Sequence, residues 1–360
     1  MAKSTSKETK SKYPKRLRMK DIADSLSINL STVSRALNSE TSSKISPDVV
    51  KQVQQAARKL GYIGNTAASG LRRKKSFTIG VVVPDILNPV FPPIIKGAQQ
   101  LLSEKGYITF IVYSDNNQDI ARDEIRKLIA RQVDGLILAS AFLEDSSVQY
   151  AVDQGTPLVL VNRTVLHPQG FHQVLSNDAL GIKLAMEHLY ELGHRKILHL
   201  AGPQDVLQGV VRLESFIDCC KSMAVEPEVI QLDAFSLDAG RKGAQQMIQQ
   251  SLDCSAILAG NDLIACGAIK ALTGQGIQVP TDLSVVGFND MPFADMLNPP
   301  LTTDSIPLKY LGVQSARLLL EEMASPGGPK SKVLLDPTLV VRDTTAPCRY
   351  TNGTQRPPRN

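Results

Sequence analysis

Apolar residues recur every three to four positions between residues 20 and 38, and this spacing predicts two short helices joined by a tight turn. The apolar positions are Ile22, Ala23 and Leu26 in the first helix and Val33, Ala36 and Leu37 in the second. The segment 27–29 interrupts the pattern. Asn29 is suited to cap the second helix, because its side chain can accept a hydrogen bond from a backbone N–H two or three residues further on. The two apolar stripes can then bury each other.

The opposite face of the second helix is polar, with Ser31, Arg35 and Asn38 at i, i+4 and i+7. An arginine can donate two hydrogen bonds to guanine O6 and N7, Ser31 and Ser34 can reach base edges or phosphates, and Leu30 can contact a thymine methyl group. This pattern fits a helix-turn-helix that reads DNA. An ordinary amphipathic hairpin with a solvated polar face has the same pattern.

A third helix is predicted to begin at Pro47, with Ser46 as its cap, and to end at Gly61. The linker that follows contains one or two helical turns, for which Asn65 is a suitable cap. The linker ends in the four basic residues 72–75, which suit contacts with phosphate groups.

From residue 78 onward, short apolar runs alternate with amphipathic segments, which predicts parallel sheets covered by helices. Strands are predicted at 79–83, 108–112, 135–138, 158–161, 197–200, 229–232, 256–258 and 285–288, and helices at 90–104, 120–131, 148–154, 179–192, 211–223, 237–250 and 263–273. The interruption at 162–176 suggests two lobes. In open α/β sheets, ligands bind at the carboxyl ends of the strands, so we expect one cleft between the lobes.

Charge is divided unevenly along the chain. Residues 1–75 carry 17 Lys and Arg against 5 Asp and Glu, a balance of +12, whereas the other 285 residues carry 23 against 30. A basic end on an acidic body is suited to capture a polyanion, with counterion release providing affinity that does not depend on sequence. The alternative, a basic tail that only maintains solubility, carries less weight because the excess coincides with the helix-turn-helix.

Composition and motifs exclude several classes of protein. The 360 residues are 42% hydrophobic and 21% charged, which is ordinary for a globular protein. Neither a secretory signal nor an apolar run of membrane-spanning length is found, so we expect a cytoplasmic protein with no membrane partner. The five cysteines have no metal-type spacing and are expected to be free thiols. Nucleotide-binding loops, zinc motifs and nucleophile elbows are also missing, so we expect no enzyme, no cofactor and no metal.

Short motifs along nearly the whole chain resemble those of the LacI/GalR family of bacterial repressors. They are the segments 32–38, 60–62, 88–89, 133–135, 188–189, 193–195, 261–262, 279–280, 284–288 and 300–303, in this order. The resemblance implies a homodimer that places two headpieces on a palindromic double-stranded operator. It also implies a body similar to a periplasmic sugar-binding protein, with an effector in the cleft.

By position, the resemblance makes 65–71 a hinge helix that folds on operator DNA, with Leu71 inserted in the minor groove. This chain departs from the family at Gly64, where proline is usual, and at Gly70, because glycine inside a helix costs about 1 kcal/mol relative to alanine. The residues predicted to contact DNA are Lys20, Leu30, Ser31, Thr32, Ser34, Arg35, Asn38, Tyr62, Asn65, Leu71 and Arg72.

The residues predicted to contact the effector are Asn88, Phe91, Arg163, Arg212, Asp262, Asn289 and Asp290. Carboxylates and arginines suit the hydroxyl and ring oxygens of a sugar, and a phenylalanine offers an apolar face to its C–H groups. Two arginines suit the carboxylate or phosphate of a sugar acid or sugar phosphate equally well. For each charged residue the alternative is a structural ion pair or a solvated loop charge.

The sequence therefore predicts an N-terminal all-α headpiece followed by a two-lobed α/β body. The expected boundaries are a basic tail at 1–17, the headpiece at 18–62, a hinge and linker at 63–76, the body at 77–346 and a tail at 347–360. The predicted function is that of an effector-controlled transcriptional regulator, most simply a repressor. The alternative is a cytoplasmic sugar-binding module with non-specific affinity for nucleic acid.

Overall fold

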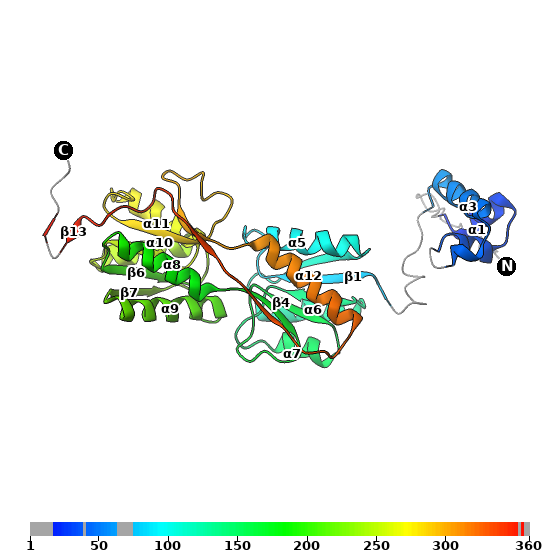
Figure 1. The fold of residues 1–360 in the computed structure, drawn as a ribbon, viewed down its shortest axis with the longest axis horizontal. Helices are drawn as coiled ribbons and strands as arrows, with labels where there is room; N and C mark the ends of the chain where they lie inside the picture. Colours follow the sequence, from blue (N-terminus) through cyan, green and yellow to red (C-terminus); the bar gives the residue numbers. More distant parts are fainter. Residues whose placement is uncertain (1–16, 39–40, 63–74, 352–353, 356–360) are drawn as a thin grey trace, which may run out of the picture. The chain divides into compact units, whose positions relative to one another are not determined.

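The computed structural model describes residues 17–38, 41–62, 75–351 and 354–355. The chain forms two compact units. The first, Met1–Lys74, contains the headpiece, and we call the second, Lys75–Asn360, the body. Figure 1 colours the headpiece blue and the body from cyan to red. Within the described ranges, no helix combines the length and the apolar character needed to cross a membrane.

The described headpiece is helical. Its elements are α1 (Met19–Leu26), α2 (Leu30–Ala36), the 3-10 helix η1 (Ser42–Lys44) and α3 (Pro47–Leu60). The three α-helices pack against one another around a small buried core. This core consists of Ile22, Ala23, Val33, Ala36, Val53 and Ala57. It includes four of the six apolar positions from which the first two helices were predicted, and the other two, Leu26 and Leu37, are partly buried against it.

The helix ends of the headpiece follow the sequence with one exception. Ser46 Oγ accepts a hydrogen bond from the Val49 N–H at 3.5 Å, and α3 ends at Gly61, which adopts a left-handed φ of 69°. Both predictions are confirmed. Asn29 stands at the cap position of α2, but the prediction of a side-chain capping bond is wrong. The turn closes through the backbone, because the carbonyl of Asn29 accepts from the N–H groups of Thr32 and Val33.

The first lobe of the body is a parallel sheet with strand order β11-β5-β4-β3-β1-β2. Its strands are β1 (Thr78–Val83), β2 (Ile108–Tyr113), β3 (Gly135–Leu138), β4 (Leu158–Val161), β5 (His172–Ser176) and β11 (Lys332–Leu335). Its helices are α5 (Phe91–Glu104), α6 (Gln118–Ala130), α7 (Ser146–Asp153) and α12 (Leu308–Ala324). Alternate residues of β1 belong to different apolar clusters, so this strand is buried on both faces.

The second lobe has the sheet order β12-β10-β9-β8-β6-β7. Its strands are β6 (Lys196–Ala201), β7 (Glu226–Gln231), β8 (Ala256–Ala259), β9 (Ser284–Asn289), β10 (Thr302–Ser305) and β12 (Thr338–Val340). Its helices are α8 (Asp178–Glu191), α9 (Leu207–Met223), α10 (Leu237–Gln249) and α11 (Asp262–Gly274). The prediction of parallel sheets holds except at the edge, where β12 runs antiparallel to β10.

The apolar pattern did not predict β5, β10, α12, β11 or β12. The 17-residue helix α12 has no clear polar stripe, because it lies between α5 and the strands β3, β4 and β5. Gly97 of α5 and Gly312 of α12 allow this contact, since a Cβ at either position would lie about 2 Å from a carbonyl oxygen of the other helix. A short antiparallel pair, β13 (Tyr350–Thr351) and β14 (Thr354–Gln355), lies in the predicted tail.

The chain passes between the lobes three times: from β5 to α8, from β10 to α12, and from β11 to β12. Each lobe is therefore made of segments that are far apart in the sequence. Figure 1 shows α12, near the C-terminus and coloured orange, lying beside α5, which is coloured cyan. The strands of the two lobes end at a cleft that both lobes line.

Candidate functional site

The polar face of α2 is available for contact in the headpiece. Leu30, Ser31 and Arg35 are exposed, as is Lys20 on α1. Thr32, Ser34, Asn38 and Tyr62 are half-buried. Because Val33 and Ala36 are buried in the headpiece core, α2 presents its polar face outward. Three predicted DNA contacts, Asn65, Leu71 and Arg72, lie outside the described residues, as does the predicted hinge helix.

The cleft of the body is lined by residues that follow strands or begin helices in both lobes. They are Asn88, Val90, Phe91, Asn162 and Arg163 of the first lobe and Gln208, Arg212, Phe235, Asn261 and Asn289 of the second. The structure thus brings together five of the seven predicted effector contacts. Asp262 and Asp290 are not among the lining residues.

Two asparagines that line the cleft have positive φ angles, 62° at Asn162 and 111° at Asn289. Asparagine tolerates such backbone conformations better than most residues with a Cβ, and they occur often at binding sites. Asn162 directly follows β4, and Asn289 ends β9. These positions therefore turn the chain sharply at the carboxyl ends of two strands, where the cleft lies.

Arg163 follows Asn162 and is only 7% exposed. Its Nη2 donates a hydrogen bond to Asn116 Oδ1 at 3.0 Å, and its Cζ lies 6.0 Å from the centre of the Phe142 ring. Burial lowers the pKa of the Arg163 guanidinium to about 10, although the charge of Asp205 opposes this shift. The group therefore remains charged at neutral pH.

Arg212, on α9, is held by several groups of the second lobe. Its Nε donates to Asp178 Oδ2 at 3.1 Å, and its Nη1 donates to the carbonyl of Gly260 at 2.6 Å. Its Cζ lies 3.8 Å from the centre of the Phe288 ring. These contacts fix the guanidinium at the floor of the cleft.

Asp262 and Asp290 each interact away from the cleft. Asp262 is fully buried, where it accepts hydrogen bonds from the Met291 N–H at 2.7 Å and the Thr303 hydroxyl at 2.5 Å. Burial raises the pKa of Asp262 to about 7 against the opposing effect of these bonds. Asp290 forms an ion pair with Arg342 at 2.7 Å. In this structure Asp262 links the start of α11 to β10 and to the segment after β9. Asp290 takes the alternative role considered above, a structural ion pair.

A group of buried titratable residues lies beneath Arg212. Asp304 of β10 is fully buried, and neither of its carboxyl oxygens has a hydrogen-bond partner. Burial raises its pKa to about 8, and Arg212 opposes this shift. His199 of β6 donates from its Nδ1 to the backbone carbonyl of Leu258 at 2.8 Å, and burial lowers its pKa to about 4. No pattern in the sequence singles out either residue for a role in the cleft.

Sequence reasoning also missed five residues that line the cleft: Val90, Asn162, Gln208, Phe235 and Asn261. Asn162, Phe235 and Asn261 lie just beyond the carboxyl ends of β4, β7 and β8. The rule that ligands bind at these strand ends is a signal that could have found them.

The two lobes are bridged across the cleft by hydrogen bonds. Gln208 Nε2 donates to the carbonyl of Asn162, and the Leu143 N–H donates to the carbonyl of Asp205 at 2.9 Å. The space left inside the cleft is about 30 Å³, room for only a few water molecules. A ligand of several carbon atoms therefore does not fit into the cleft as the lobes stand in this structure.

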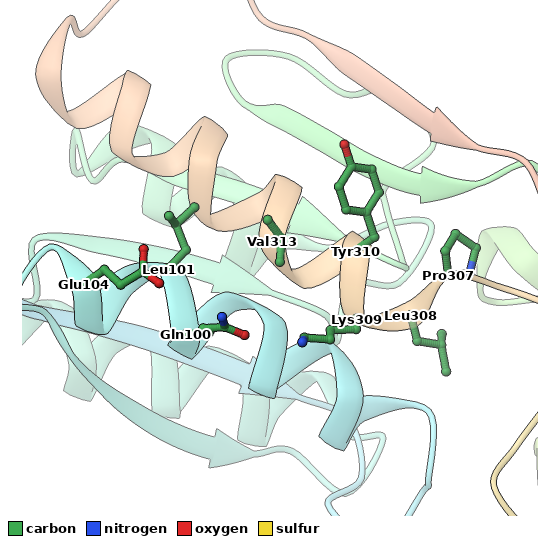
Figure 2. A pocket seen from close by; sticks show the side chains of 8 residues that line it. All are labelled: Gln100, Leu101, Glu104, Pro307, Leu308, Lys309, Tyr310 and Val313. Carbon is green, nitrogen blue, oxygen red and sulfur yellow. The ribbon is translucent and has the colours of Figure 1, made fainter.

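A larger hollow, of about 650 Å³, lies on the surface of the first lobe between α5 and α12. Figure 2 shows its lining side chains, which include Gln100 and Glu104 from α5 and Lys309, Tyr310 and Val313 from α12. All its lining residues belong to α5, α12 or the residue before α12. This groove is therefore separate from the cleft to which both lobes contribute.

Comparisons with known proteins match both units. Residues 18–65 match the family described as bacterial regulatory proteins, lacI family, and residues 186–345 match a periplasmic binding protein-like domain. The ribose operon repressor of Halalkalibacterium halodurans is 32% identical over 327 residues, which cover 91% of this chain and 96% of that protein. The chain belongs to the LacI family. The resemblance and the function predicted from the sequence, that of a DNA-binding transcriptional regulator, are confirmed.

Solved structures extend the similarity of this LacI-family protein to its fold. The lac repressor dimer bound to operator and the anti-inducer ONPF is 25% identical, with a TM-score of 0.83, and covers 92% of this chain and 100% of that chain. A LacI family regulator from Enterococcus faecium with bound ribose is 27% identical, with a TM-score of 0.67, over 75% of this chain and 99% of that chain. The predicted fold class is confirmed.

Proposed function

We propose that this LacI-family protein represses transcription as a homodimer that binds a palindromic operator, and that a sugar or sugar derivative in the cleft controls this binding. The observation that carries the proposal is the cleft itself, around which Asn88, Phe91, Arg163, Arg212 and Asn289 gather. An effector that prefers one arrangement of the lobes changes operator affinity, and the operator changes effector affinity by the same factor.

The headpiece supplies the DNA-reading part of this function. Its exposed residues Lys20, Leu30, Ser31 and Arg35 are accessible for contacts with the major groove of the operator. Half-buried Thr32, Ser34, Asn38 and Tyr62 would contact base edges or phosphates at its margins. We assign the headpiece to 18–62 and the hinge to 63–76. In this assignment Asn65, Leu71 and Arg72 of the hinge also contact the operator.

The cleft suits a polar ligand with an apolar face. Its amides both donate and accept hydrogen bonds, its arginines donate, and Phe91 and Phe235 provide flat apolar surfaces. The ribose bound to the Enterococcus faecium regulator supports an effector of this class. The lining residues bind and orient a ligand without a nucleophile and base among them, so we assign no enzymatic activity.

The first lobe offers a surface for a second copy of the chain. Strand β2 is at the edge of its sheet and exposes Ile108, Phe110, Ile111 and Tyr113. An exposed apolar edge strand is a site for association between chains. Two-fold symmetry of the protein matches the two half-sites of a palindrome.

We also propose that the protein acts in the cytoplasm, where the chromosome lies.

Selection of genomic fragments by the purified full-length protein at physiological salt tests the proposal. Enrichment of one palindrome is expected. A ligand bound in the cleft should then change the fraction of this palindrome that is bound by the protein. Enrichment that depends only on fragment length would instead support a sugar-binding module with non-specific affinity for nucleic acid, because that affinity comes from phosphate contacts. The family relationship does not favour this second reading.

Replacing Arg35 by alanine should weaken binding to the selected operator by about 1–3 kcal/mol, because a bidentate contact with guanine is lost. The measurement is a fluorescence anisotropy titration with operator and scrambled duplexes. Lys59→Ala removes one exposed positive charge from α3 of the same headpiece and serves as the control. An Arg35 variant that binds the operator as tightly as the Lys59 variant would remove Arg35 from the reading face.

Replacing Phe110 by aspartate should shift the protein from dimer to monomer in sedimentation velocity at micromolar concentration. The residue is 46% exposed on β2, and burying a carboxylate there against a second chain is unfavourable. Leu334→Asp changes a residue of similar exposure on β11, at the opposite edge of the same sheet, and should leave the dimer intact. Equal behaviour of the two variants would place the dimer contact elsewhere.

A further inference from the structure

The two arginines of the cleft differ in how their charges are neutralised. Arg212 has a carboxylate partner, Asp178, with which its Nε forms an ion pair at 3.1 Å. Arg163 takes part in none of the ion pairs found among the described residues, and its Nη1 is buried without a hydrogen-bond partner. The side-chain oxygen to which Arg163 donates a hydrogen bond, Asn116 Oδ1, is neutral. The first lobe thus brings an uncompensated positive charge to the cleft.

This arrangement is unfavourable in the absence of a partner. Buried charges in proteins are usually paired and hydrogen-bonded, because removing them from water costs several kcal/mol per ion. The charge of Asp205, in the second lobe, raises the pKa of Arg163, but the two residues form none of the ion pairs found among the described residues. The bond between the Leu143 N–H and the Asp205 carbonyl connects the backbones of the two lobes at this point.

The surroundings of Arg163 favour a ligand group with several acceptor oxygens. Asn88 and Asn162 line the same side of the cleft and can donate through their amides. A guanidinium presents parallel N–H donors that match a carboxylate or phosphate group in a bidentate geometry. A neutral hydroxyl can accept one of these bonds but leaves the charge unbalanced. The missing partner is therefore an anion.

Building on the proposed function, we propose that the effector is a sugar derivative that carries an anionic group, phosphate or carboxylate, and that Arg163 binds this group in the cleft. Arg212, already neutralised by Asp178, then contacts the uncharged hydroxyls. In this assignment Arg163 determines the charge class of the effector, and Asn116 positions its guanidinium.

The test uses the full-length protein without DNA and follows thermal unfolding in inorganic phosphate, with chloride at equal ionic strength as the reference. A site of millimolar affinity raises the Tm by about 5 °C at 50 mM phosphate. Arg163→Gln should lose this increase, and Arg163→Lys should retain part of it. Arg131→Gln, which removes an exposed arginine from the same lobe, should respond as the wild type does.

Ligand-free stability provides an independent measurement. Arg163→Gln removes an unpaired buried charge, so its Tm without ligand should be equal to or higher than that of the wild type. A purely structural arginine would give a lower Tm. A lower Tm, or a phosphate response that Arg163→Gln retains in full, would overturn the proposal.

Calorimetric titrations identify the anion. Ribose 5-phosphate is compared with ribose, and gluconate with glucose, and at least one anionic member of these pairs should bind tenfold or more tightly, with a preference that Arg163→Gln abolishes. A preference for ribose 5-phosphate over ribose indicates a phosphate group, and a preference for gluconate over glucose indicates a carboxylate group. Equal binding of charged and neutral members overturns the proposal. Operator selection that persists in that case leaves the proposed repressor function standing, so the two failures are distinguishable.

Discussion

Replacing Asp304 by asparagine should stabilise the body, and the gain should grow with pH. The carboxyl group of Asp304 is fully buried without a hydrogen-bond partner, and its pKa is raised to about 8. An aspartate in the unfolded chain has a pKa of about 3.9. Between these two values the folded protein holds a proton that the unfolded chain releases, so stability is lost as the pH rises. Asparagine removes this dependence.

The expected difference in unfolding free energy between Asp304→Asn and the wild type increases by about 1.4 kcal/mol per pH unit between about pH 4 and pH 8. Urea unfolding at pH 5, 6.5 and 8 measures it, with tyrosine fluorescence as the signal, because the chain has no tryptophan. Asp295→Asn changes an exposed carboxylate and serves as the control. A difference that stays constant across this range would show that Asp304 is ionised in the folded protein.

Other buried groups shape the pH dependence of the wild type. Asp262, with its pKa raised to about 7, acts in the same direction as Asp304. His194 and His199, with pKa values lowered by burial to about 4, act in the opposite direction, because each is neutral in the fold and charged in the unfolded chain below about pH 6.5. These effects oppose each other between about pH 4 and 6.5. Stability should therefore fall mainly from about pH 6.5 to 8, which is why the difference between variant and wild type isolates Asp304.

Replacing Arg212 by alanine should destabilise the body by about 3–5 kcal/mol, the cost typical of removing one partner of a buried ion pair. Asp178 loses its cation, the Gly260 carbonyl loses a donor, and the ring of Phe288 loses the guanidinium packed on it. Urea unfolding at pH 7 measures the loss. A variant with lost effector response but full stability would show that Arg212 acts only on the ligand.

A double variant separates the charge from the packing. Arg212→Met together with Asp178→Asn removes both charges and keeps most of the volume, so it should recover a large part of the stability lost in Arg212→Ala. Equal stability of the single and double variants would assign the loss to packing and to the bond with Gly260. Operator binding by the headpiece provides a check that this unit is still folded.

The repetition of strands and helices was predictable because strands buried on both faces are continuous apolar runs. The predicted ranges 135–138 and 158–161 coincide with β3 and β4. Helix α12 was not predictable in this way, because it packs against both the sheet and α5, and its exposed stripe, which includes Tyr310, Arg317 and Glu321, is too narrow to set a clear period. Its place in the first lobe also depends on a return of the chain that no local pattern encodes.

The site was predictable in position but not in side-chain direction. Asn261 and Asn289 line the cleft, whereas their neighbours Asp262 and Asp290 bond within the second lobe. Asn289 ends β9 and Asn261 caps α11, and at both places the next side chain bonds elsewhere, so a motif places a pair of residues at the cleft without saying which one faces it. The unpaired state of Arg163 depends on every carboxylate around it, and only the tertiary structure shows it.

The passage of the chain from one lobe to the other has a consequence for biosynthesis. The first four strands of the first lobe are complete at residue 161, but α12, which packs against β3 and β4, ends at residue 324. At about 5–20 residues per second, a ribosome takes roughly 10–30 s to make the residues between them. During that time one face of the nascent sheet waits for its helix and is a target for chaperones. A nascent chain that stops ahead of β11 leaves an edge of each sheet without its last strand, so synthesis must pass β11 to complete the first sheet and β12 to complete the second.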